Sequence, residues 1–207
     1  EAYIQYRHGG TECRLHRITY VGELGFEIYI PYNNLEKVFD VVYAKNGKSP
    51  VKLAGYHALN SLRMEKGYLH WGHDIGVEEN PFEAGVGFCV NLNKKKPFLG
   101  QAALEEKKKS GLSKRKVNFA LSNNDLLIYH NEPIYFDGKI VGEISSGMYG
   151  FYLDKSLGMG YISNNDSYSI EEMMSHQKFE IEVAETKYSA EGSINCFYDP
   201  GREKILV

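Results

Sequence analysis

Residues 133–144 read PIYFDGKIVGEI, and this stretch decides the fold class of the second half of the chain. Two apolar runs flank Asp137-Gly138, and both turn residues tolerate the positive φ angles of a two-residue hairpin loop. The stretch therefore predicts a β-hairpin. Three further strand-like runs surround it: residues 116–121 (KVNFAL), 157–162 and 179–184. The second half is therefore predicted to be an antiparallel β-domain in the form of a small barrel.

The first hundred residues mix strand and helix signals. Residues 14–20 (RLHRITY) and 26–30 (FEIYI) predict strands on either side of a glycine-containing turn. Apolar residues at 35, 38, 39 and 42 follow the spacing of one helix face. Three further elements complete the pattern: a strand at 51–54 and helices at 56–66 and about 101–109.

This change of pattern divides the chain. We expect a mixed α/β lobe over residues 1–105 and an antiparallel β-barrel domain over residues 106–207, so the fold class is α+β.

Composition excludes several classes of protein. The net charge of −3 argues against a generally basic, nucleic-acid-binding surface. No run approaches the roughly 20 apolar residues of a membrane span. Three widely spaced cysteines, Cys13, Cys89 and Cys196, fit a reducing compartment better than a disulfide framework. We therefore expect no nucleic-acid or membrane partner and a cytoplasmic location, or the mitochondrial matrix in a eukaryote.

Acidic and aromatic residues gather around one turn, where Tyr20, Glu23, Phe26 and Glu27 lie close together. A carboxylate beside aromatic rings suits a flat heterocycle, because it accepts hydrogen bonds from an amino-pyrimidine edge while rings stack on the face. The alternative is that Glu27 is an ordinary exposed strand residue. His70, His73 and Asp74 lack the helical HExxH context, so polar loop contacts are favoured over a metal site.

Several longer motifs occur in a fixed order: TYVGELGFEIYIP (19–31), AGYHALNSLRMEKGYLHWGHDI (54–75), NPFEAGVGF (80–88), PFLGQAAL (97–104) and FYDPGREK (197–204). On these motifs the chain resembles the aminomethyltransferase family, also called the glycine cleavage T-protein family. The resemblance is closest to the branch formed by the folate-binding part of sarcosine and dimethylglycine dehydrogenases.

The resemblance implies a fold of three lobes around a central folate site, two of them mixed α/β and the third an antiparallel barrel. The chain looks like the C-terminal half to two-thirds of such a unit. We therefore expect a first lobe upstream of Glu1, preceded in dehydrogenases by a domain that binds FAD. Without that lobe, exposed apolar surface favours self-association.

The resemblance also implies a function. In dehydrogenases of this family a flavin oxidises an N-methylamine, and tetrahydrofolate captures the one-carbon unit as methylenetetrahydrofolate. Two alternatives are an aminomethyltransferase that works with a lipoyl carrier, and a non-catalytic regulatory subunit of pyruvate dehydrogenase phosphatase. Leu59 stands where T-proteins carry a folate-contacting Arg, which favours the dehydrogenase over the transferase. Glu27 in its GELGFE motif favours folate binding over the regulatory role.

Four residues match family positions that bind the cofactor. Glu27 and Tyr20 are expected to contact folate, and Tyr68 and Phe88 fall where relatives place aromatic rings along it. T-proteins typically have Trp at the position of Phe88. Three further matches, Arg63, Glu65 and Asp74, are interpreted as structural. The family's catalytic Asp lies in the first lobe, so we expect no catalytic residue and no turnover from residues 1–207 alone.

Overall fold

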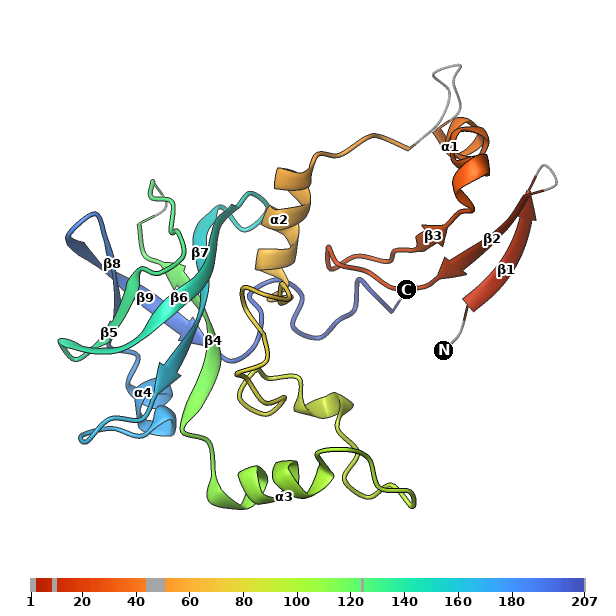
Figure 1. Ribbon diagram of the computed structural model, residues 1–207. Coiled ribbons are helices and arrows are strands. Elements are labelled where there is room, and N and C mark those ends of the chain that lie inside the picture. The colour runs from red at the N-terminus through yellow and green to blue at the C-terminus, as the bar shows by residue number, and fades with distance from the viewer. Residues whose placement is uncertain (1–2, 9–10, 44–50, 124, 207) are drawn as a thin grey trace. The chain divides into compact units, whose positions relative to one another are not determined.

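The structure is a computed structural model that describes residues 3–8, 11–43, 51–123 and 125–206. These residues form two compact units (Figure 1). Unit 1 comprises Glu1–Arg63 with Gly201–Val207, and unit 2 comprises Met64–Pro200. The division that we predict between residues 105 and 106 falls inside helix α3 (Gln101–Ser110), and it stays a prediction about the lobes of the family.

Unit 1 contains a three-stranded antiparallel sheet with the strand order β1-β2-β3. The strands are β1 (Tyr3–His8), β2 (Thr11–His16) and β3 (Glu27–Tyr29). The strand predicted at 14–20 thus begins and ends earlier, at residues 11–16, the strand predicted at 26–30 is shorter, and residues 17–26 between them form a loop. His16 lies opposite Glu27 in the β2–β3 ladder, so this register fixes the face on which Glu27 projects.

The predicted helices of the first half are present. After the short 3-10 turn η1 (Tyr32–Asn34), α1 (Leu35–Tyr43) buries Val38 on its apolar face. Helix α2 (Tyr56–Glu65) ends just before Gly67, whose positive φ of 67° is the left-handed conformation that terminates helices.

The strand predicted at residues 51–54 is wrong. These four residues are extended but exposed, and they join no sheet among the residues that the structure describes. A run of four with a central lysine buries too little apolar surface to define a strand without a partner.

Unit 2 contains the closed barrel, in which the strand order is β4-β7-β6-β5-β8-β9 and every pairing is antiparallel. Its strands are β4 (Lys114–Leu121), β5 (Pro133–Phe136), β6 (Lys139–Gly150), β7 (Lys155–Ser163), β8 (Phe179–Val183) and β9 (Thr186–Ser193). The predicted hairpin joins β5 to β6, because Asp137 and Gly138 both take positive φ. The α+β class and the barrel are therefore confirmed.

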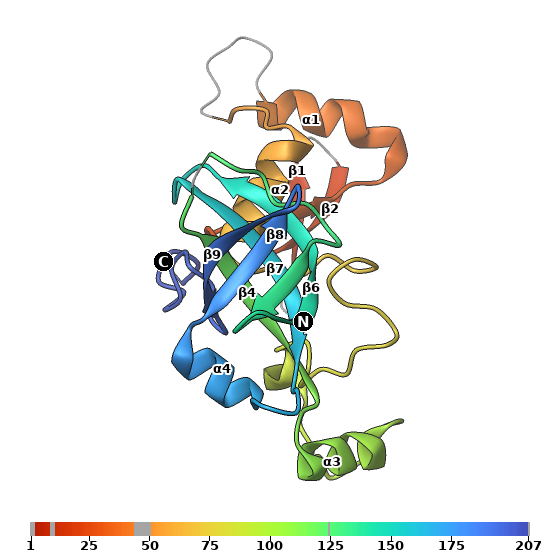
Figure 2. The ribbon, with the colours of Figure 1, turned by 90° about the vertical axis from the view of Figure 1, so that its left-hand side faces the viewer.

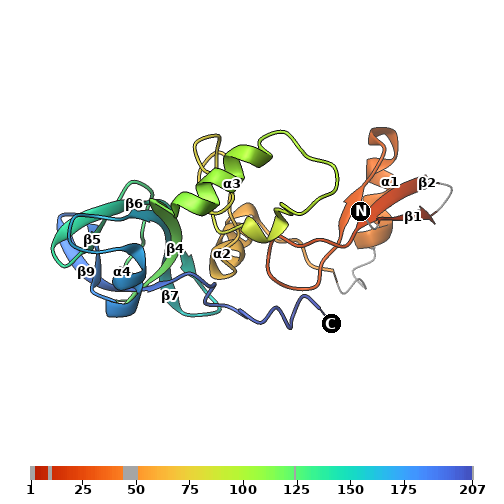
Figure 3. The same ribbon diagram turned by 90° about the horizontal axis from the view of Figure 1, so that it is seen from below.

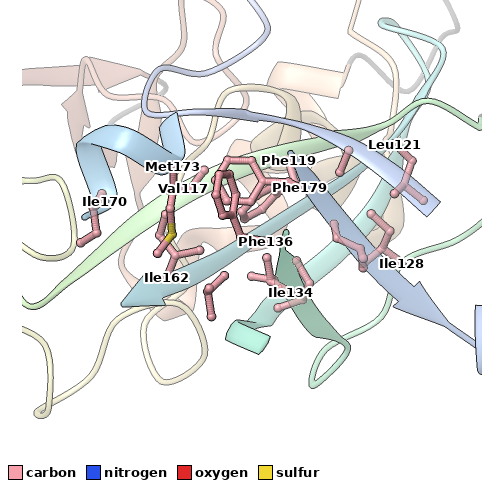
Figure 4. Packing of buried hydrophobic residues seen from close by; sticks show 14 residues of the cluster. Val117, Phe119, Leu121, Ile128, Ile134, Phe136, Ile162, Ile170, Met173 and Phe179 are labelled. Atoms are coloured by element: carbon pink, nitrogen blue, oxygen red, sulfur yellow. The ribbon is translucent and has the colours of Figure 1, made fainter. Parts of the chain in front are cut away.

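The barrel interior contains an apolar cluster in which three phenylalanine rings pack edge to face (Figure 4). Phe179 packs edge-on against Phe119 and Phe136, with ring centroids 5.4 and 5.1 Å apart, and all three rings are buried. Gly192 leaves room for this stack, because a Cβ there would lie 2.9 Å from the Phe179 ring.

Helix α4 (Ile170–His176) lies at one end of the barrel and adds Ile170 and Met173 to its core (Figure 2). Ser169 and Glu172 form a capping box at its start, a signal that the sequence carries but that we do not predict above. Before the barrel, α3 runs beside the irregular segment at residues 67–100 (Figure 3). Within the described residues, none of the helices has the length and apolar character needed to cross a membrane.

Candidate functional site

The four predicted cofactor residues are distributed over both units. Tyr20 and Glu27 belong to unit 1, whereas Tyr68 and Phe88 belong to unit 2. Glu27 is exposed, and Tyr20 and Tyr68 are half-buried. Phe88 lies in the 3-10 turn η2 (Gly87–Cys89) with 86% of its surface exposed.

Glu27 lies on an exposed sheet face between two rings. Tyr29 is two residues further along β3 and projects from the same face. Its hydroxyl donates a 2.7 Å hydrogen bond to Oε2 of Glu27. Tyr29 also packs on His16 of β2, with ring centroids 4.9 Å apart. The bond to Glu27, together with the carboxylate charge, raises the pKa of Tyr29. Glu27 is therefore a carboxylate that one hydroxyl holds in place and two rings border.

A hollow lies beside this carboxylate in unit 1, with a volume of about 590 Å³. Its walls include His16 and Tyr29, the two rings next to Glu27, and Arg14, which lies opposite Tyr29 in the ladder. The hollow therefore offers aromatic faces one strand pair from the carboxylate, with Glu12 and Arg14 supplying one charge of each sign to its walls. This arrangement fits a flat ligand that donates hydrogen bonds from one edge.

The loop between β2 and β3 depends on two glycines. Gly22 takes a φ of +81°, which an L side chain adopts rarely. At Gly25 a Cβ would lie 3.2 Å from the carbonyl oxygen of Ile18, so the two sides of the loop approach closely there. The GELG sequence thus lets the loop fold back on itself, and the chain enters β3 at Glu27.

Phe88 lines two adjoining hollows of unit 2, about 920 and about 360 Å³ in volume. Phe82 forms the opposite aromatic wall, and it packs so closely on Gly87 that a Cβ there would lie 2.7 Å from its ring. Lys108 lines both hollows. Phe88 is therefore a solvent-facing ring beside positive charge.

Sequence reasoning missed Tyr29, His16 and Arg14 as neighbours of Glu27. The signal for Tyr29 is present, because strand alternation puts residues i and i+2 on one face. His16 and Arg14 need the β2–β3 register, which depends on the length of the loop and is not encoded in either strand alone.

The three buried charged residues that we interpret as structural have protein partners. Glu65 accepts hydrogen bonds from the backbone N–H groups of Tyr152 and Leu153, at 2.8 and 3.0 Å. Asp74 accepts from the backbone N–H of His70 at 2.8 Å and from the Ser145 hydroxyl at 2.5 Å. These bonds satisfy loop and strand groups that the fold removes from water.

Arg63 is the third of these residues, and its Nε donates to the Asn60 side chain at 2.8 Å. The His70 and His73 rings meet edge to face, 5.0 Å apart. In the part of the chain that the structure describes, no group of three His, Cys, Asp or Glu side chains is placed to hold a metal ion.

Lys116 is a buried lysine on β4, and its ammonium group donates to Oδ1 of Asn118 at 2.9 Å. Burial lowers its pKa to about 8, with the Asp74 carboxylate opposing this shift. An unfolded lysine has a pKa of about 10.4, so the unfolded state binds more protons between these values. Lys116 therefore makes the free energy of unfolding rise with pH.

We expect this rise between about pH 8 and pH 10, at most about 1.4 kcal/mol per pH unit. Above about pH 10 the raised pKa of half-buried Tyr161 acts in the opposite direction, because the folded state then keeps a proton that the unfolded state releases. Urea unfolding at pH 8 and 9.5 should show that Lys116→Met removes the rise while exposed Lys107→Met keeps it. An equal slope in both variants would contradict the assignment to Lys116.

Two family models match the chain. The one described as the GCVT N-terminal domain matches residues 2–94, and the one described as the glycine cleavage T-protein C-terminal barrel domain matches residues 114–199. The second match covers most of the barrel described above, and the first contains all four predicted cofactor residues.

Curated relatives include two oxidising enzymes. The chain is 36% identical over 189 residues to 4-methylaminobutanoate oxidase (formaldehyde-forming) of Paenarthrobacter nicotinovorans, which covers 91% of this chain and 22% of that protein. It is 32% identical over 200 residues to human mitochondrial sarcosine dehydrogenase, covering 96% of this chain and 22% of that protein. The chain thus spans about a fifth of the length of these relatives.

Among solved structures, the fold is similar to that of the glycine cleavage system aminomethyltransferase T from Bartonella henselae. The TM-score is 0.74 at 24% sequence identity, over 93% of this chain and 50% of that one. This likeness concerns the fold. Because the two family models match most of the sequence, in the order of a mixed lobe and then a barrel, the chain belongs to the glycine cleavage T-protein family.

Proposed function

We propose that this chain is the tetrahydrofolate-binding portion of a protein like sarcosine or dimethylglycine dehydrogenase. In that role it captures as methylenetetrahydrofolate the one-carbon unit that oxidation of an N-methylamine releases. The observation that carries the proposal is the exposed Glu27 carboxylate, held by Tyr29 and bordered by rings and a hollow. Membership of the glycine cleavage T-protein family and the similarity to two oxidising enzymes support it.

Glu27 would receive the amino-pyrimidine edge of the pterin. Tyr29 donates to Oε2 from one side, and the exposed carboxylate can accept further hydrogen bonds from a ligand. A hydrogen bond to a charged group contributes about 1.5–3 kcal/mol, so a pterin N–H on Glu27 is a substantial part of a micromolar affinity. Tyr20, Tyr68 and Phe88 are proposed to border the rest of the folate.

Bound tetrahydrofolate supplies the nucleophilic nitrogens that accept a one-carbon unit. The task of this chain is to orient those nitrogens and to keep water away from the reactive carbon. We assign no catalytic residue to it. A first lobe with the catalytic Asp, an FAD-binding domain, and location in the cytoplasm or the mitochondrial matrix belong to the same proposal.

The two alternatives predict different things. An aminomethyltransferase would need a group at the position of Leu59, in α2, that contacts folate as the Arg of T-proteins does. A non-catalytic regulatory subunit of pyruvate dehydrogenase phosphatase would have no need of the Glu27 carboxylate. Residues 19–31 retain that carboxylate and its loop, and position 59 is Leu, so we favour the dehydrogenase.

Glu27→Gln tests the proposal in the full-length protein. The amide keeps the size of the side chain but loses its charge and offers N–H groups to ligand donors. We expect tetrahydrofolate to bind at least tenfold more weakly by calorimetry, about 1.4 kcal/mol. Glu36→Gln on α1 makes the same charge change at an exposed site of unit 1 and should leave the affinity unchanged. An unchanged affinity of Glu27→Gln would remove Glu27 from the site.

A further inference from the structure

The loop at residues 17–26 carries Tyr20 and leads into β3 at Glu27. Inside it, the N–H of Ile18 donates to the His16 carbonyl at 3.0 Å, and the N–H of Val21 donates to the Thr19 hydroxyl at 3.2 Å. Both bonds are local. Three of its large apolar side chains, Ile18, Leu24 and Phe26, are exposed. These three side chains therefore contribute little buried apolar surface to the local stability of the loop.

Residues 204 and 205, almost two hundred positions away in the sequence, contact this loop. The Lys204 carbonyl accepts a 3.1 Å hydrogen bond from the backbone N–H of Leu24. The next carbonyl, that of Ile205, accepts a 3.2 Å hydrogen bond from the Arg17 guanidinium. Arg17 opens the loop and Leu24 stands three residues before Glu27, so the two bonds hold both sides of the loop. All these residues belong to unit 1.

Just upstream of residues 203–205, Asp199 is held within unit 2. The buried Lys66 ammonium group donates to both the carboxylate and the carbonyl of Asp199, at 2.7 and 2.6 Å. Asp199 and Arg202 take positive φ angles of 43° and 60°, on either side of Pro200-Gly201. Non-glycine residues adopt this conformation uncommonly, so the chain is held in a specific turn as it approaches residues 204–205.

We propose that residues 203–205 act as a positioning segment for the loop at residues 17–26. Two backbone carbonyls of this segment fix the loop, and the loop fixes where Glu27 and Tyr20 meet the ligand. The segment would thus set folate affinity without touching folate. The effect on affinity rests on the proposed function, whereas the effect on the loop does not.

Three versions of the 207-residue chain test this, ending at Val207, at Ile205 or at Glu203. The version that ends at Ile205 keeps both acceptor carbonyls, and the version that ends at Glu203 loses both. Hydrogen exchange of the Leu24 amide should be about tenfold faster in the chain ending at Glu203 and unchanged in the chain ending at Ile205. The same loss should weaken tetrahydrofolate binding severalfold, while the thermal unfolding of the barrel stays the same.

The two readouts separate the two proposals. Unchanged exchange of Leu24 in the chain ending at Glu203 would overturn the positioning role. Faster exchange with an unchanged folate affinity would overturn the link between the loop and binding. The Glu27→Gln test in the full-length protein decides the proposed function separately, and faster Leu24 exchange in the chain ending at Glu203 supports the positioning role for the loop whatever the outcome of that test.

Discussion

Phe179→Ala should lower the free energy of unfolding of the barrel by about 3–5 kcal/mol. The Phe179 ring contacts two other buried rings at once, those of Phe119 and Phe136. Its removal therefore loses the transfer free energy of one ring and two edge-to-face contacts, and it leaves a cavity that strands closed into a barrel cannot easily fill. Urea unfolding followed by far-UV circular dichroism measures the loss.

Phe151→Ala is the matched control for this prediction. Phe151 is the same residue type, but 74% of its surface is exposed. Its truncation should change the free energy of unfolding by less than about 1 kcal/mol. A loss below about 1 kcal/mol for Phe179→Ala as well would mean that the three rings do not form the packed interior that Figure 4 shows.

Lys66→Met should lower the free energy of unfolding by a comparable amount, because it breaks a buried ion pair. The side chains of Lys66 and Asp199 retain only 2% and 10% of their exposure, and Nζ lies 2.7 Å from Oδ2. Methionine has a similar length, so it preserves much of the packing, but it leaves the Asp199 carboxylate without this cation. Removal of one partner of a buried pair costs about 3–5 kcal/mol. Urea unfolding again gives the measured value.

Two further variants separate the pair from the loss of a charge. Lys107→Met removes an exposed lysine from α3 and should change stability by less than about 0.5 kcal/mol. The double variant Lys66→Met/Asp199→Asn should lose less than the two single variants added together, because the uncompensated carboxylate is gone. Additive losses would show that the two side chains do not act as a pair.

The strands and the hairpin of the barrel could be predicted because the sequence signals for them are local. Asp137-Gly138 specifies a tight hairpin through the two positive φ angles that it allows, and alternating runs mark the strands on either side. The closure of the barrel between β4 and β9 joins residues about 70 positions apart, and no local pattern encodes it. The succession of short strands and turns favours a small barrel as a class, and the resemblance to a known family agrees with it, but neither gives this pairing.

Other elements could not be predicted, or were predicted wrongly, for physical reasons. The run at residues 51–54 has strand-forming residues but belongs to no strand among the described residues, and a strand exists only through its pairing. The capping box of α4 spans four residues and precedes only two turns of helix, so its signal is weak over any window. The short β3 is defined by its register against β2 more than by its own three residues.

The candidate site, too, could be predicted only in part from the sequence. Tyr20, Glu27, Tyr68 and Phe88 were predicted from motif positions, because without the resemblance the pattern favoured Glu27 as an ordinary exposed strand residue. The structure adds that Tyr29 holds the Glu27 carboxylate and that His16 lies beside Tyr29. Those contacts arise from pairing across a loop whose conformation depends on Gly22, Gly25 and the terminal segment.

The most direct test is a crystal structure of the full-length protein with bound folinic acid, a reduced folate. We expect the amino and ring N–H groups of its heterocycle within about 3.2 Å of the Glu27 carboxylate oxygens. We also expect Tyr20 or Tyr29 to border the ring. A folate bound elsewhere, with the Glu27 carboxylate facing only solvent and Tyr29, would contradict the proposal that Glu27 holds the pterin.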